Sequence, residues 1–592
     1  MFSLFKYTRK RDWLFLAITV GLIVLQVWLE LKLPKYTAKL TQIVQIGEQG
    51  GLTDMGEVWK NGGLMLACAL GSLLASVICT FIVSKIASAF SMTLRDKIYS
   101  KISSFSSAEI NKFSTASLIT RTTNDIMQMQ NFMAMGIQLL FKAPIMAIWA
   151  ICKISTANVS WTIAIIISVA VIIVCIAILV GICFPKFRKI QKLTDEINNI
   201  TRESVSGVRV VRAFNAEEYQ EGKFEKTNDK ITKNHLFTSR AMGVMMPMLT
   251  LVMNGVILAI YWIGAILVNN VANNGDMLAV MTERIELIGN MTAFTQYSLQ
   301  IIMAFMMLIM IFVILPRTIV SSRRINEVLN TQSSIVGATT EVKTDKVGEI
   351  EFKNVSFAYD KGLDKNAISN VSFKVNRGQT LAIVGATGSA KSTLINLIPR
   401  FYDVTQGEVL VDGVNVKDYP DNQLRDKIAV ATQKAVLFKG TIKDNIAYGS
   451  EEIDEDKLNK VIEISQSQFV NQLEDGINSI VAQGGTNFSG GQKQRLSIAR
   501  ALYKDAEIMI FDDTFSALDY KTDMLVRKSI KENFSDKTII IVAQRIGTIK
   551  DVDKILVLDE GEIVGEGKHE DLLNSCPLYK EIALSQLAEE EL

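Results

Sequence analysis

Six long apolar runs occupy the first half of the chain and are separated by polar segments. Each run is long enough to cross a bilayer, which requires about 20 apolar residues in a helix. The pattern predicts spans near Trp13–Leu33, Leu64–Phe90, Phe132–Ile151, Val159–Phe184, Val244–Val268 and Ile285–Leu315. The last run has about 31 residues, or roughly 46 Å as a helix, and should extend beyond a hydrocarbon core of about 30 Å.

Lysine and arginine gather on one side of these predicted spans. They precede the first span and recur in the segments 91–131 and 186–243, whereas Asn269–Asp276 has no basic residue. Because basic loops stay in the cytoplasm, the N-terminus is expected to be cytoplasmic. Both basic segments keep helical periodicity and contain no proline, which predicts membrane helices continuing into the cytoplasm. No small-residue cleavage site follows the first run, which favours a retained helix over a signal peptide.

A polar linker follows the last span and leads to a mixed strand and helix pattern. We therefore predict a transmembrane domain at 1–329, a linker at 330–347 and an α/β domain at 348–592. The net charge of +2 argues against a nucleic-acid partner, since no basic face dominates. Five cysteines (Cys68, Cys79, Cys152, Cys175 and Cys183) fall in apolar runs without metal-ligand spacing and are expected to be buried free thiols.

A glycine-rich loop stands between the apolar strand Thr380–Val384 and the predicted helix Leu394–Ile398. This arrangement is typical of a phosphate-binding loop, in which backbone N–H groups and a helix N-terminus hold a polyphosphate. We expect nucleotide contacts from Gly385, Ala386, Thr387, Gly388, Ser389, Ala390, Lys391, Ser392 and Thr393. The loop departs from the motif at Ala390, where the motif has glycine.

A second feature supports nucleotide binding. The apolar strand Ile508–Phe511 ends at Asp512, and the Ser392 hydroxyl stands directly after Lys391. Lys391 is expected to reach the β- and γ-phosphates, with Ser392 and Asp512 holding Mg²⁺. Asp512 alone would be better explained as a solvated carboxylate at a strand end. Its combination with the phosphate loop predicts an ATP and Mg²⁺ site.

Between these two features lies the stretch Asn487–Arg495, which reads Asn-Phe-Ser-Gly-Gly-Gln-Lys-Gln-Arg and opens a predicted helix. It resembles the signature motif of the ABC transporter family. Six spans followed by one nucleotide domain also resemble an ABC half-exporter over nearly the whole chain. The expected fold is an α-helical membrane domain with long cytoplasmic extensions, fused to an α/β P-loop nucleotide-binding domain.

The resemblance implies roles for further residues. Tyr359 looks like the aromatic that stacks on adenine, Gln433 like the Q-loop glutamine that reaches Mg²⁺ and the reacting water, and Asp519 like the D-loop aspartate. In this family two nucleotide domains enclose two ATP molecules head to tail. Signature residues of one chain therefore complete the site of the other, which implies that Ser489, Gly490, Gly491 and Gln492 bind the partner's nucleotide.

Three positions of the chain's own nucleotide site break the family pattern, and Gln483, just before the signature, also stands where exporters often have glutamate. Asp513 stands where the family places a catalytic glutamate, and Gln544 replaces the switch histidine. Aspartate is one methylene shorter, and a misplacement of about 1 Å can cost roughly 100-fold in rate. Ala390 adds a Cβ where the loop should wrap the phosphates. All three belong to one composite site while the signature is intact, which resembles the degenerate-site subunit of a bacterial heterodimeric exporter.

The expected function is ATP-driven export of hydrophobic or amphipathic compounds across the bacterial plasma membrane, as half of a heterodimer with a second half-exporter. A peptide or lipid exporter, a homodimeric exporter and a regulatory subunit with negligible hydrolysis stay open. The fused domain order disfavours an importer, and six spans exclude a soluble ABC ATPase.

The remaining features concern coupling and cargo. Lys112–Arg121 and Arg212–Tyr219 match the positions where exporters dock on nucleotide domains. Methionines recur with helical spacing near the fifth and sixth spans (Met242, Met245, Met246, Met303, Met306, Met307 and Met310), which suits an adaptable apolar wall, although ordinary helix packing explains any one of them better. Lys142 lies within the third span and is a candidate cavity residue.

Overall fold

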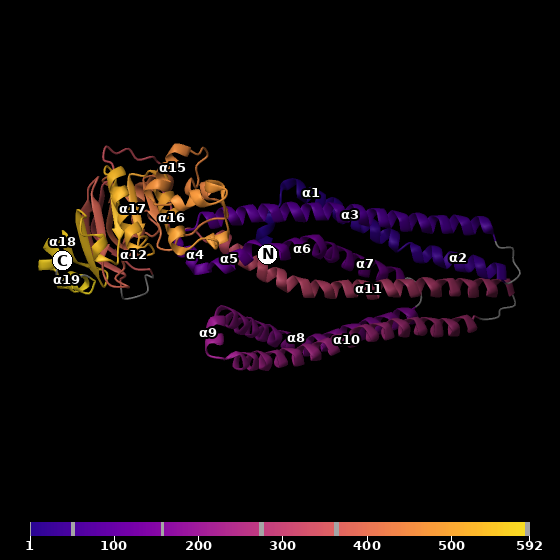
Figure 1. Ribbon diagram of the computed structural model, residues 1–592. Helices are drawn as coiled ribbons and strands as arrows, with labels where there is room; N and C mark the ends of the chain where they lie inside the picture. The colour runs from indigo at the N-terminus through magenta and orange to yellow at the C-terminus, as the bar shows by residue number, and fades with distance from the viewer. Residues whose placement is uncertain (1, 49–53, 156–158, 272–276, 360–365, 587–592) are drawn as a thin grey trace. The chain divides into compact units, whose positions relative to one another are not determined.

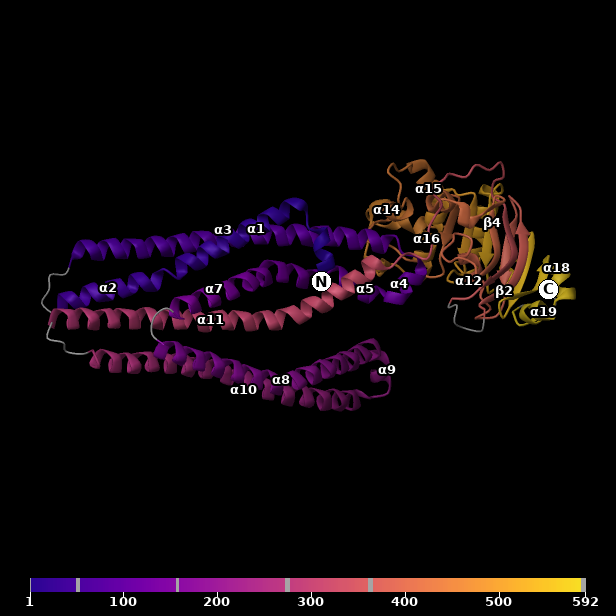
Figure 2. The same cartoon turned by 180° about the vertical axis from the view of Figure 1, so that it is seen from behind.

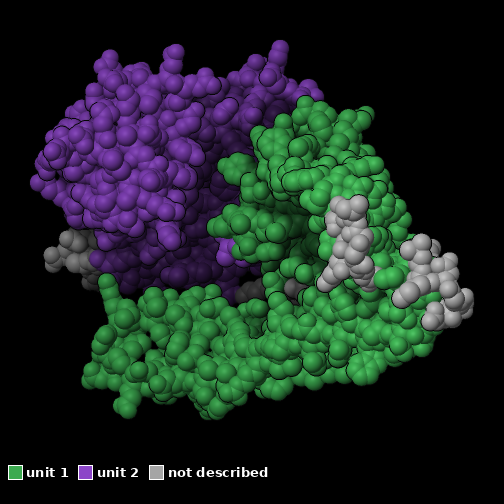
Figure 3. Space-filling view, turned by 90° about the vertical axis from the view of Figure 1, so that its right-hand side faces the viewer, with its two compact units in different colours: residues 1–101, 118–330 green, residues 102–117, 331–592 purple. Residues whose placement is uncertain are grey.

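A computed structural model describes residues 2–48, 54–155, 159–271, 277–359 and 366–586. The chain forms two compact units, coloured separately in Figure 3. One comprises residues 1–101 and 118–330, and the other comprises residues 102–117 and 331–592. The second unit thus includes a short piece of the predicted transmembrane domain, in addition to the C-terminal domain.

The first unit is helical, and six of its helical segments are long and apolar enough to cross a membrane, as predicted. These segments are Lys10–Ile46, Met55–Ser103, Thr115–Ile154, Val159–Ser206, Glu217–Asn269 and Ala279–Asn330. The helices that build them are α1 (Lys10–Glu30), α2 (Leu33–Glu48), α3 (Met55–Ser103), α5 (Thr115–Thr122), α6 (Asn124–Asn131), the π-helical turn η2 (Phe132–Gly136), α7 (Ile137–Ser155), α8 (Val159–Ser206), α10 (Glu217–Asn269) and α11 (Met277–Asn330). Several are about 50 residues long, so they extend well beyond a bilayer.

Within this unit α8 and α10 lie side by side and are joined by the short helix α9 (Val208–Ala213), as Figures 1 and 2 show. The indole Nε1 of Trp161 on α8 donates to the Ile260 carbonyl on α10 at 3.1 Å. The same indole packs against Phe294 of α11, with ring centroids 4.8 Å apart. Phe214, directly after α9, is 79% exposed.

The short helix α4 (Ser107–Phe113) belongs to the second unit. Ser106 and Glu109 form a capping box at its start, and Glu109 Oε1 also accepts from the Ser334 backbone N–H at 3.1 Å. Burial alone would raise the pKa of the Glu109 carboxyl, but its hydrogen bonds to Ser106 and Ser334 outweigh this effect and lower the pKa. Asn111 donates to the Tyr402 hydroxyl at 3.4 Å. These contacts tie residues 102–117 to the nucleotide domain, so the compact units do not follow the boundary at residue 329.

The second unit contains two main sheets. The first, in the order β2-β1-β4-β5, comprises β2 (Ile368–Val375), β1 (Ile350–Phe357), β4 (Gln406–Val411) and β5 (Val414–Asn415). The second, in the order β12-β11-β3-β10-β9-β6, comprises β12 (Glu562–Gly567), β11 (Lys554–Asp559), β3 (Thr380–Val384), β10 (Thr538–Val542), β9 (Ile508–Asp512) and β6 (Ile428–Ala431). A small ribbon pairs β7 (Gly440–Thr441) with β8 (Ile480–Val481).

In the described part of the C-terminal domain, eight α-helices accompany these sheets: α12 (Lys391–Asn396), α13 (Asp421–Asp426), α14 (Ile442–Ile446), α15 (Glu455–Ile464), α16 (Gly490–Lys504), α17 (Tyr520–Asn533), α18 (His569–Ser575) and α19 (Pro577–Leu584). The strands β3, β9 and β10 are buried almost throughout. Parallel strands covered on both faces have this continuous apolar character. Their apolar sequences therefore predict their position in the middle of the sheet.

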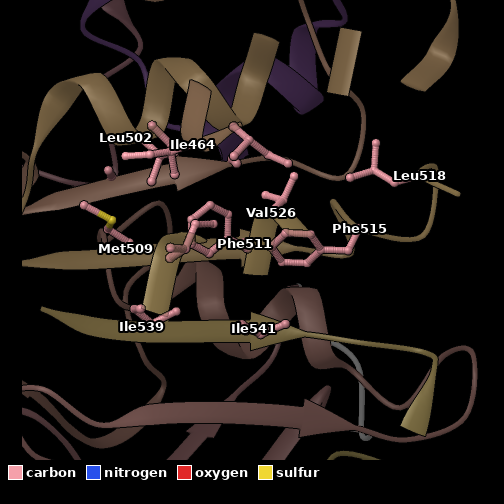
Figure 4. Close-up of a cluster of buried hydrophobic side chains, with 14 of the residues drawn as sticks. Ile464, Leu502, Met509, Phe511, Phe515, Leu518, Val526, Ile539 and Ile541 are labelled. Atoms are coloured by element: carbon pink, nitrogen blue, oxygen red, sulfur yellow. The ribbon is translucent and has the colours of Figure 1, made fainter. Parts of the chain in front are cut away.

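A hydrophobic cluster that includes side chains of β9 and β10 holds the turn after β9 in place. Figure 4 shows Phe511 and Phe515 close together within this cluster, and their ring centroids are 5.4 Å apart. Both rings are buried, with Val526 and Ile541 among the neighbouring side chains (Figure 4). Because the two rings lie before and after Asp512 and Asp513, their packing holds the backbone that carries both carboxylates.

The cysteines differ in part from expectation. All six are free thiols, and Cys68, Cys79 and Cys183 are buried as predicted. Cys152 is exposed and Cys175 is partly exposed, so the expectation of burial is wrong for these two. They lie on spans with apolar side chains on several faces, and an apolar run does not distinguish a protein-facing position from a lipid-facing one.

Candidate functional site

Five neighbouring parallel strands direct the predicted site residues to one edge of the large sheet. In the order β11-β3-β10-β9-β6, every adjacent pair is parallel. Parallel strands present their carboxyl ends together, and ligands of open α/β sheets bind beyond these ends. The phosphate loop follows β3, Asp512 ends β9, Gln544 follows β10, and Gln433 follows β6.

The phosphate loop is a compact turn between β3 and α12. Lys391 Nζ donates to the carbonyl oxygens of Gly385 and Ala386, both at 2.8 Å. A Cβ at Gly385 would collide with the Leu558 carbonyl, so glycine is needed there for close backbone approach. Burial lowers the pKa of Lys391, while the nearby Asp513 and Asp512 oppose this effect. The Lys391 ammonium therefore lies within the loop, bound to carbonyl oxygens. A phosphate in the loop would replace these acceptors or bind the ammonium beside them.

Ala390 adopts a left-handed backbone conformation, with φ of 73° and ψ of 21°. This conformation costs an L-residue roughly 1–2 kcal/mol because Cβ crowds the following carbonyl. Glycine has no such cost, which explains why the motif has glycine at this position. The departure recognised in the sequence is thus a site of local backbone strain at the start of α12.

Asp512 and Ser392 form the pair expected to hold Mg²⁺. The Ser392 hydroxyl donates to Asp512 Oδ1 at 3.0 Å, and Asp512 is only 9% exposed. Burial raises the pKa of Asp512, and the nearby Asp513 adds to this effect. The hydrogen bond from Ser392 lowers the pKa but does not cancel the increase. Two hard oxygen ligands fit Mg²⁺, which takes one or two protein oxygens and completes its shell with phosphate and water. Among the described residues no group of three or more His, Cys, Asp or Glu side chains could hold a metal ion.

Asp513 is held by both glutamines that the sequence assigned to the site. Its Oδ2 accepts from Gln544 Nε2 at 2.6 Å and from Gln433 Nε2 at 3.1 Å. The residue is 7% exposed and has a left-handed φ of 49°, a region that Asp tolerates better than most residues. The side chains of Asp513, Gln544 and Gln433 therefore form one hydrogen-bonded group.

A cleft of about 820 Å³ lies at this edge of the sheet. It is lined by Tyr359, Asn366, Ala367, Ala386, Thr387, Gly388, Ser389, Ala390, Lys391, Ser392, Thr393, Gln433, Asp512, Asp513, Val542, Gln544, Asp559 and Glu560. The structure thus brings nearly all predicted own-site residues together. Sequence reasoning missed Asn366, Asp559 and Glu560. Asp559 ends the buried strand β11 and Glu560 follows it, which is a signal of the same kind that identified Asp512.

Tyr359 lies at the rim of this cleft and is 58% exposed. Its hydroxyl is 3.0 Å from Thr393 Oγ1, and its ring packs edge-on against Tyr402 with centroids 5.2 Å apart. The exposed ring is available for stacking, and the hydroxyl contact fixes its position relative to α12. This geometry fits the aromatic role that the sequence indicated.

The signature residues lie elsewhere on the same unit. Ser489 caps α16, where its N–H donates to Gln492 Oε1 at 2.9 Å and its Oγ accepts from the Gln492 N–H at 3.3 Å. Ser489 and Gly490 are exposed, and none of Ser489, Gly490, Gly491 and Gln492 lines the cleft. Asp519 is also absent from the cleft; it caps α17 and accepts from the Thr522 N–H at 3.0 Å.

A contact from the C-terminal end reaches the switch position. The side-chain amide of Gln586 donates to the Gln544 carbonyl at 2.8 Å and accepts from the Ile546 N–H at 2.8 Å. Gln586 follows α19, about 40 residues after the segment it contacts. No motif in the sequence indicated this pairing. It fixes the backbone of the residue that hydrogen-bonds Asp513.

Comparisons with known proteins agree with this geometry. The family profile of the ABC transporter transmembrane region matches residues 15–291, and the ABC transporter profile matches residues 368–516. An uncharacterized ABC transporter ATP-binding protein of Mycobacterium tuberculosis is 37% identical over 529 residues, covering 88% of this chain and 87% of that protein. An ATP-dependent lipid A-core flippase of Desulfotalea psychrophila is 31% identical over 484 residues, covering 81% of each chain.

The structure of a bacterial Atm1-family ABC exporter with ATP bound superposes with a TM-score of 0.76 at 22% identity, over 96% of this chain and 98% of the other. At that identity the likeness shows the fold alone. The sequence relatives, the two family matches and the phosphate loop at the sheet edge point to the same family. The chain belongs to the ABC transporter family and is a multi-pass membrane protein of the exporter type, with one transmembrane region and one ATP-binding domain.

Proposed function

We propose that this chain is one half of a heterodimeric exporter of hydrophobic or amphipathic compounds in the bacterial cell membrane. Its own phosphate loop holds ATP at a weakly hydrolysing site, and its signature helix completes the efficient site of a partner half-exporter. The N-terminus and the nucleotide domain lie in the cytoplasm. ATP binding closes the two nucleotide domains, and hydrolysis at the partner's loop resets them.

The observation that carries this proposal is the distribution of the departures from the family pattern. Ala390, Asp513 and Gln544 all line one cleft. The intact signature residues Ser489–Gln492 lie outside that cleft and begin at an exposed helix N-terminus. Independent drift would be expected to alter the signature residues as well as the residues that serve this chain's own nucleotide.

The chemistry of the Asp513 group supports slow hydrolysis. Asp513 Oδ2 accepts two amide hydrogen bonds, so this oxygen is committed to Gln433 and Gln544. Gln544 cannot change its charge at physiological pH, whereas histidine can. Removing the proton from an attacking water needs a base within hydrogen-bond reach, and the shorter aspartate is drawn toward the glutamines instead. Mg²⁺ held by Ser392 and Asp512 would neutralise phosphate charge whether hydrolysis at this site is slow or fast.

The cargo class is supported by the membrane unit. Met303 and Met310 of α11 and Met242 and Met246 of α10 are between 43% and 67% exposed. Flexible thioethers adapt to apolar compounds of different shape. A lipid exporter is the second candidate, because a curated relative is named as a lipid A-core flippase. A peptide exporter is a further alternative.

The test measures Mg-ATPase activity of the purified chain alone and with a coexpressed candidate half-exporter. We expect little activity alone and high activity together. In the complex, Asp513→Asn should change the rate less than about twofold, whereas replacing the partner's catalytic glutamate with glutamine should lower it by about 100-fold or more.

Three outcomes would contradict the proposal. High activity of the chain alone would favour a homodimeric exporter. A large loss with Asp513→Asn in the complex would show that this chain's own site is catalytic. Nucleotide binding without turnover in either preparation would favour the regulatory subunit.

A further inference from the structure

The first membrane-spanning segment, Lys10–Ile46, is interrupted between α1 and α2. Helix α1 ends at Glu30 and α2 begins at Leu33, with Pro34 in its first turn. A continuous helix would hydrogen-bond the Glu30 carbonyl to the N–H of residue 34, and proline has no N–H. Gln300 of α11 supplies the missing donor, since its Nε2 donates to the Glu30 carbonyl at 3.2 Å.

The next carbonyl is satisfied in the same way, because the Tyr297 hydroxyl donates to the Leu31 carbonyl at 3.1 Å. Irregular backbone is tolerated at membrane depth only where protein or a polar cavity covers it. In transporters, broken membrane helices typically form ligand and ion sites. The break between α1 and α2 therefore directs attention to the side chains around it.

Side chains from four spans meet at the break. Glu30 Oε1 accepts from Lys142 Nζ of α7 at 3.0 Å, from Gln26 Nε2 of α1 at 2.9 Å, and from Ser72 Oγ of α3 at 3.2 Å. Together with Gln300 of α11 they form a set that we name the Glu30 cluster: Gln26, Glu30, Ser72, Lys142 and Gln300. Lys142, the candidate cavity residue of the sequence, is thus joined to a carboxylate that the sequence had not singled out.

The Glu30 cluster has hydrogen-bonding capacity left over. All three side-chain donors use Glu30 Oε1, so Oε2 has no hydrogen-bond partner among the described residues. Lys142 carries three N–H donors, and one is used by Glu30. Gln300 Oε1 is buried and has no partner within the described part of the chain. A purely structural ion pair in a membrane would be expected to satisfy these groups internally.

The pair is also accessible. The side chains of Lys142 and Glu30 are 21% and 22% exposed. Lys142 lies about ten residues from either end of its predicted span, or roughly 15 Å along a helix. Ionisable groups at such depth usually face a cavity or a pathway. The accessible side of the pair therefore offers an acceptor, Glu30 Oε2, beside free donors on Lys142.

We propose that the Glu30 cluster binds a zwitterionic head group that carries an N–H-bearing ammonium and a phosphate or carboxylate. The ammonium donates to Glu30 Oε2, and the anionic group accepts from Lys142. This site deepens the proposed function, because it supplies the polar half of the binding site for an exported amphipathic compound.

Charge balance selects this class over a simple cation or anion. The Glu30–Lys142 pair is neutral overall, and a zwitterion leaves the occupied site neutral. A cation that took over Glu30 would leave Lys142 without its counter-charge, and an anion on Lys142 would do the same to Glu30. Leaving one member of a largely buried ion pair alone is strongly unfavourable.

The experiment measures binding of short-chain lipids to the full-length chain in detergent, by native mass spectrometry. The probes are phosphatidylethanolamine, phosphatidylcholine, which lacks ammonium N–H donors, and phosphatidylglycerol, which is anionic. We expect phosphatidylethanolamine to bind at least about 10-fold more tightly than either of the others. Glu30→Gln keeps the volume and the acceptor for Gln26, Ser72 and Lys142, and should remove this preference, as should Lys142→Met.

The matched control is Lys85→Met, which removes an exposed lysine of α3 outside the Glu30 cluster and should keep the preference. Water-soluble phosphoethanolamine distinguishes the sources of the head group: competition by it at similar concentration indicates a soluble zwitterion, and its failure indicates a lipid. Both support the site.

An unchanged preference in Glu30→Gln would overturn the proposal, as would equal binding of phosphatidylcholine. Glu30→Gln is the more decisive variant, since Lys142→Met exposes an unpaired carboxylate and could perturb folding. Binding is measured without ATP turnover or a partner. Failure of this site and failure of the heterodimer proposal are therefore separable.

Discussion

Replacing Asp512 with asparagine should stabilise the nucleotide-free domain while weakening Mg²⁺-dependent nucleotide binding. Asp512 is 9% exposed and adjoins Asp513, which is 7% exposed. Burial raises the pKa of Asp512, which means that the fold disfavours the charged form. Asparagine has almost the same volume and keeps an oxygen that can accept from the Ser392 hydroxyl. The substitution therefore removes an unfavourable charge and retains the hydrogen bond.

We expect a gain of about 1 kcal/mol in the free energy of unfolding, at the low end of the cost of incompletely satisfied buried polar groups. For a domain of this size that corresponds to an increase in Tm of about 2–4 °C. The size of this gain depends on pH. A raised carboxyl pKa means that the folded wild-type chain loses stability as the pH rises from the ordinary value of 3.8 through the raised value, and the full penalty is present above the raised value. The advantage of the variant should be largest at about pH 8 and should shrink as the pH falls toward the ordinary aspartate value of 3.8.

Calorimetry of the full chain in detergent is the suitable assay. All six tryptophans lie in the membrane unit, at Trp13, Trp28, Trp59, Trp149, Trp161 and Trp262, so tryptophan fluorescence does not follow unfolding of the nucleotide domain. With Mg-ATP the order should reverse. The wild-type chain should gain stability, whereas Asp512→Asn should bind at least about 10-fold more weakly, equivalent to about 1.4 kcal/mol. Asp475→Asn, at an exposed aspartate of the same domain, is the control and should change neither quantity.

A lower Tm of the nucleotide-free variant would refute the electrostatic reasoning. Full Mg²⁺-dependent stabilisation of the variant would refute the assignment of Asp512 as a metal ligand.

Two further predictions concern the same domain. Arg500→Lys should lower the free energy of unfolding by about 3 kcal/mol. The Arg500 guanidinium donates to the backbone carbonyl and the side-chain oxygen of Asn445 and to the Val436 carbonyl, at 2.7–2.9 Å. A lysine ammonium cannot reproduce this geometry. A calorimetric loss below about 1 kcal/mol would contradict it. Ala390→Gly should raise the free energy of unfolding by about 0.5 kcal/mol, since relief of the left-handed strain exceeds the entropy cost of glycine, and a measured decrease would show that the strain is absent.

Several parts of the site could be predicted from sequence because their signals are local. The apolar strand before Gly385 and the apolar strand before Asp512 both read as buried parallel strands, and both are found in the large sheet. Ser489 followed by Gln492 has the spacing of a capping box, and that box is present at the start of α16. In each case the determining interactions span only a few residues.

Other features had no local signal. The Gln586 contact joins residues about 40 positions apart, and the Glu30–Lys142 pair joins residues 112 positions apart. Glu30 falls within a predicted span, and the apolar pattern there shows only that a helix is long and apolar enough to cross a membrane. Which polar side chains meet depends on how the helices pack, and that depends on the sum of many side-chain contacts along them.

The sequence by itself determined the six spans, the nucleotide domain, the family and the unusual residues at its ATP site, because strands, helices and loops are specified by short-range pattern and by motif spacing. Only the tertiary structure decided that Asp513 is held by two glutamines, that residues 102–117 group with the nucleotide domain, and that Glu30, Lys142 and Gln300 meet at a break in the first span. The physical reason is that these contacts form between segments distant in the chain. Their partners are chosen by packing and by the need to satisfy buried polar groups.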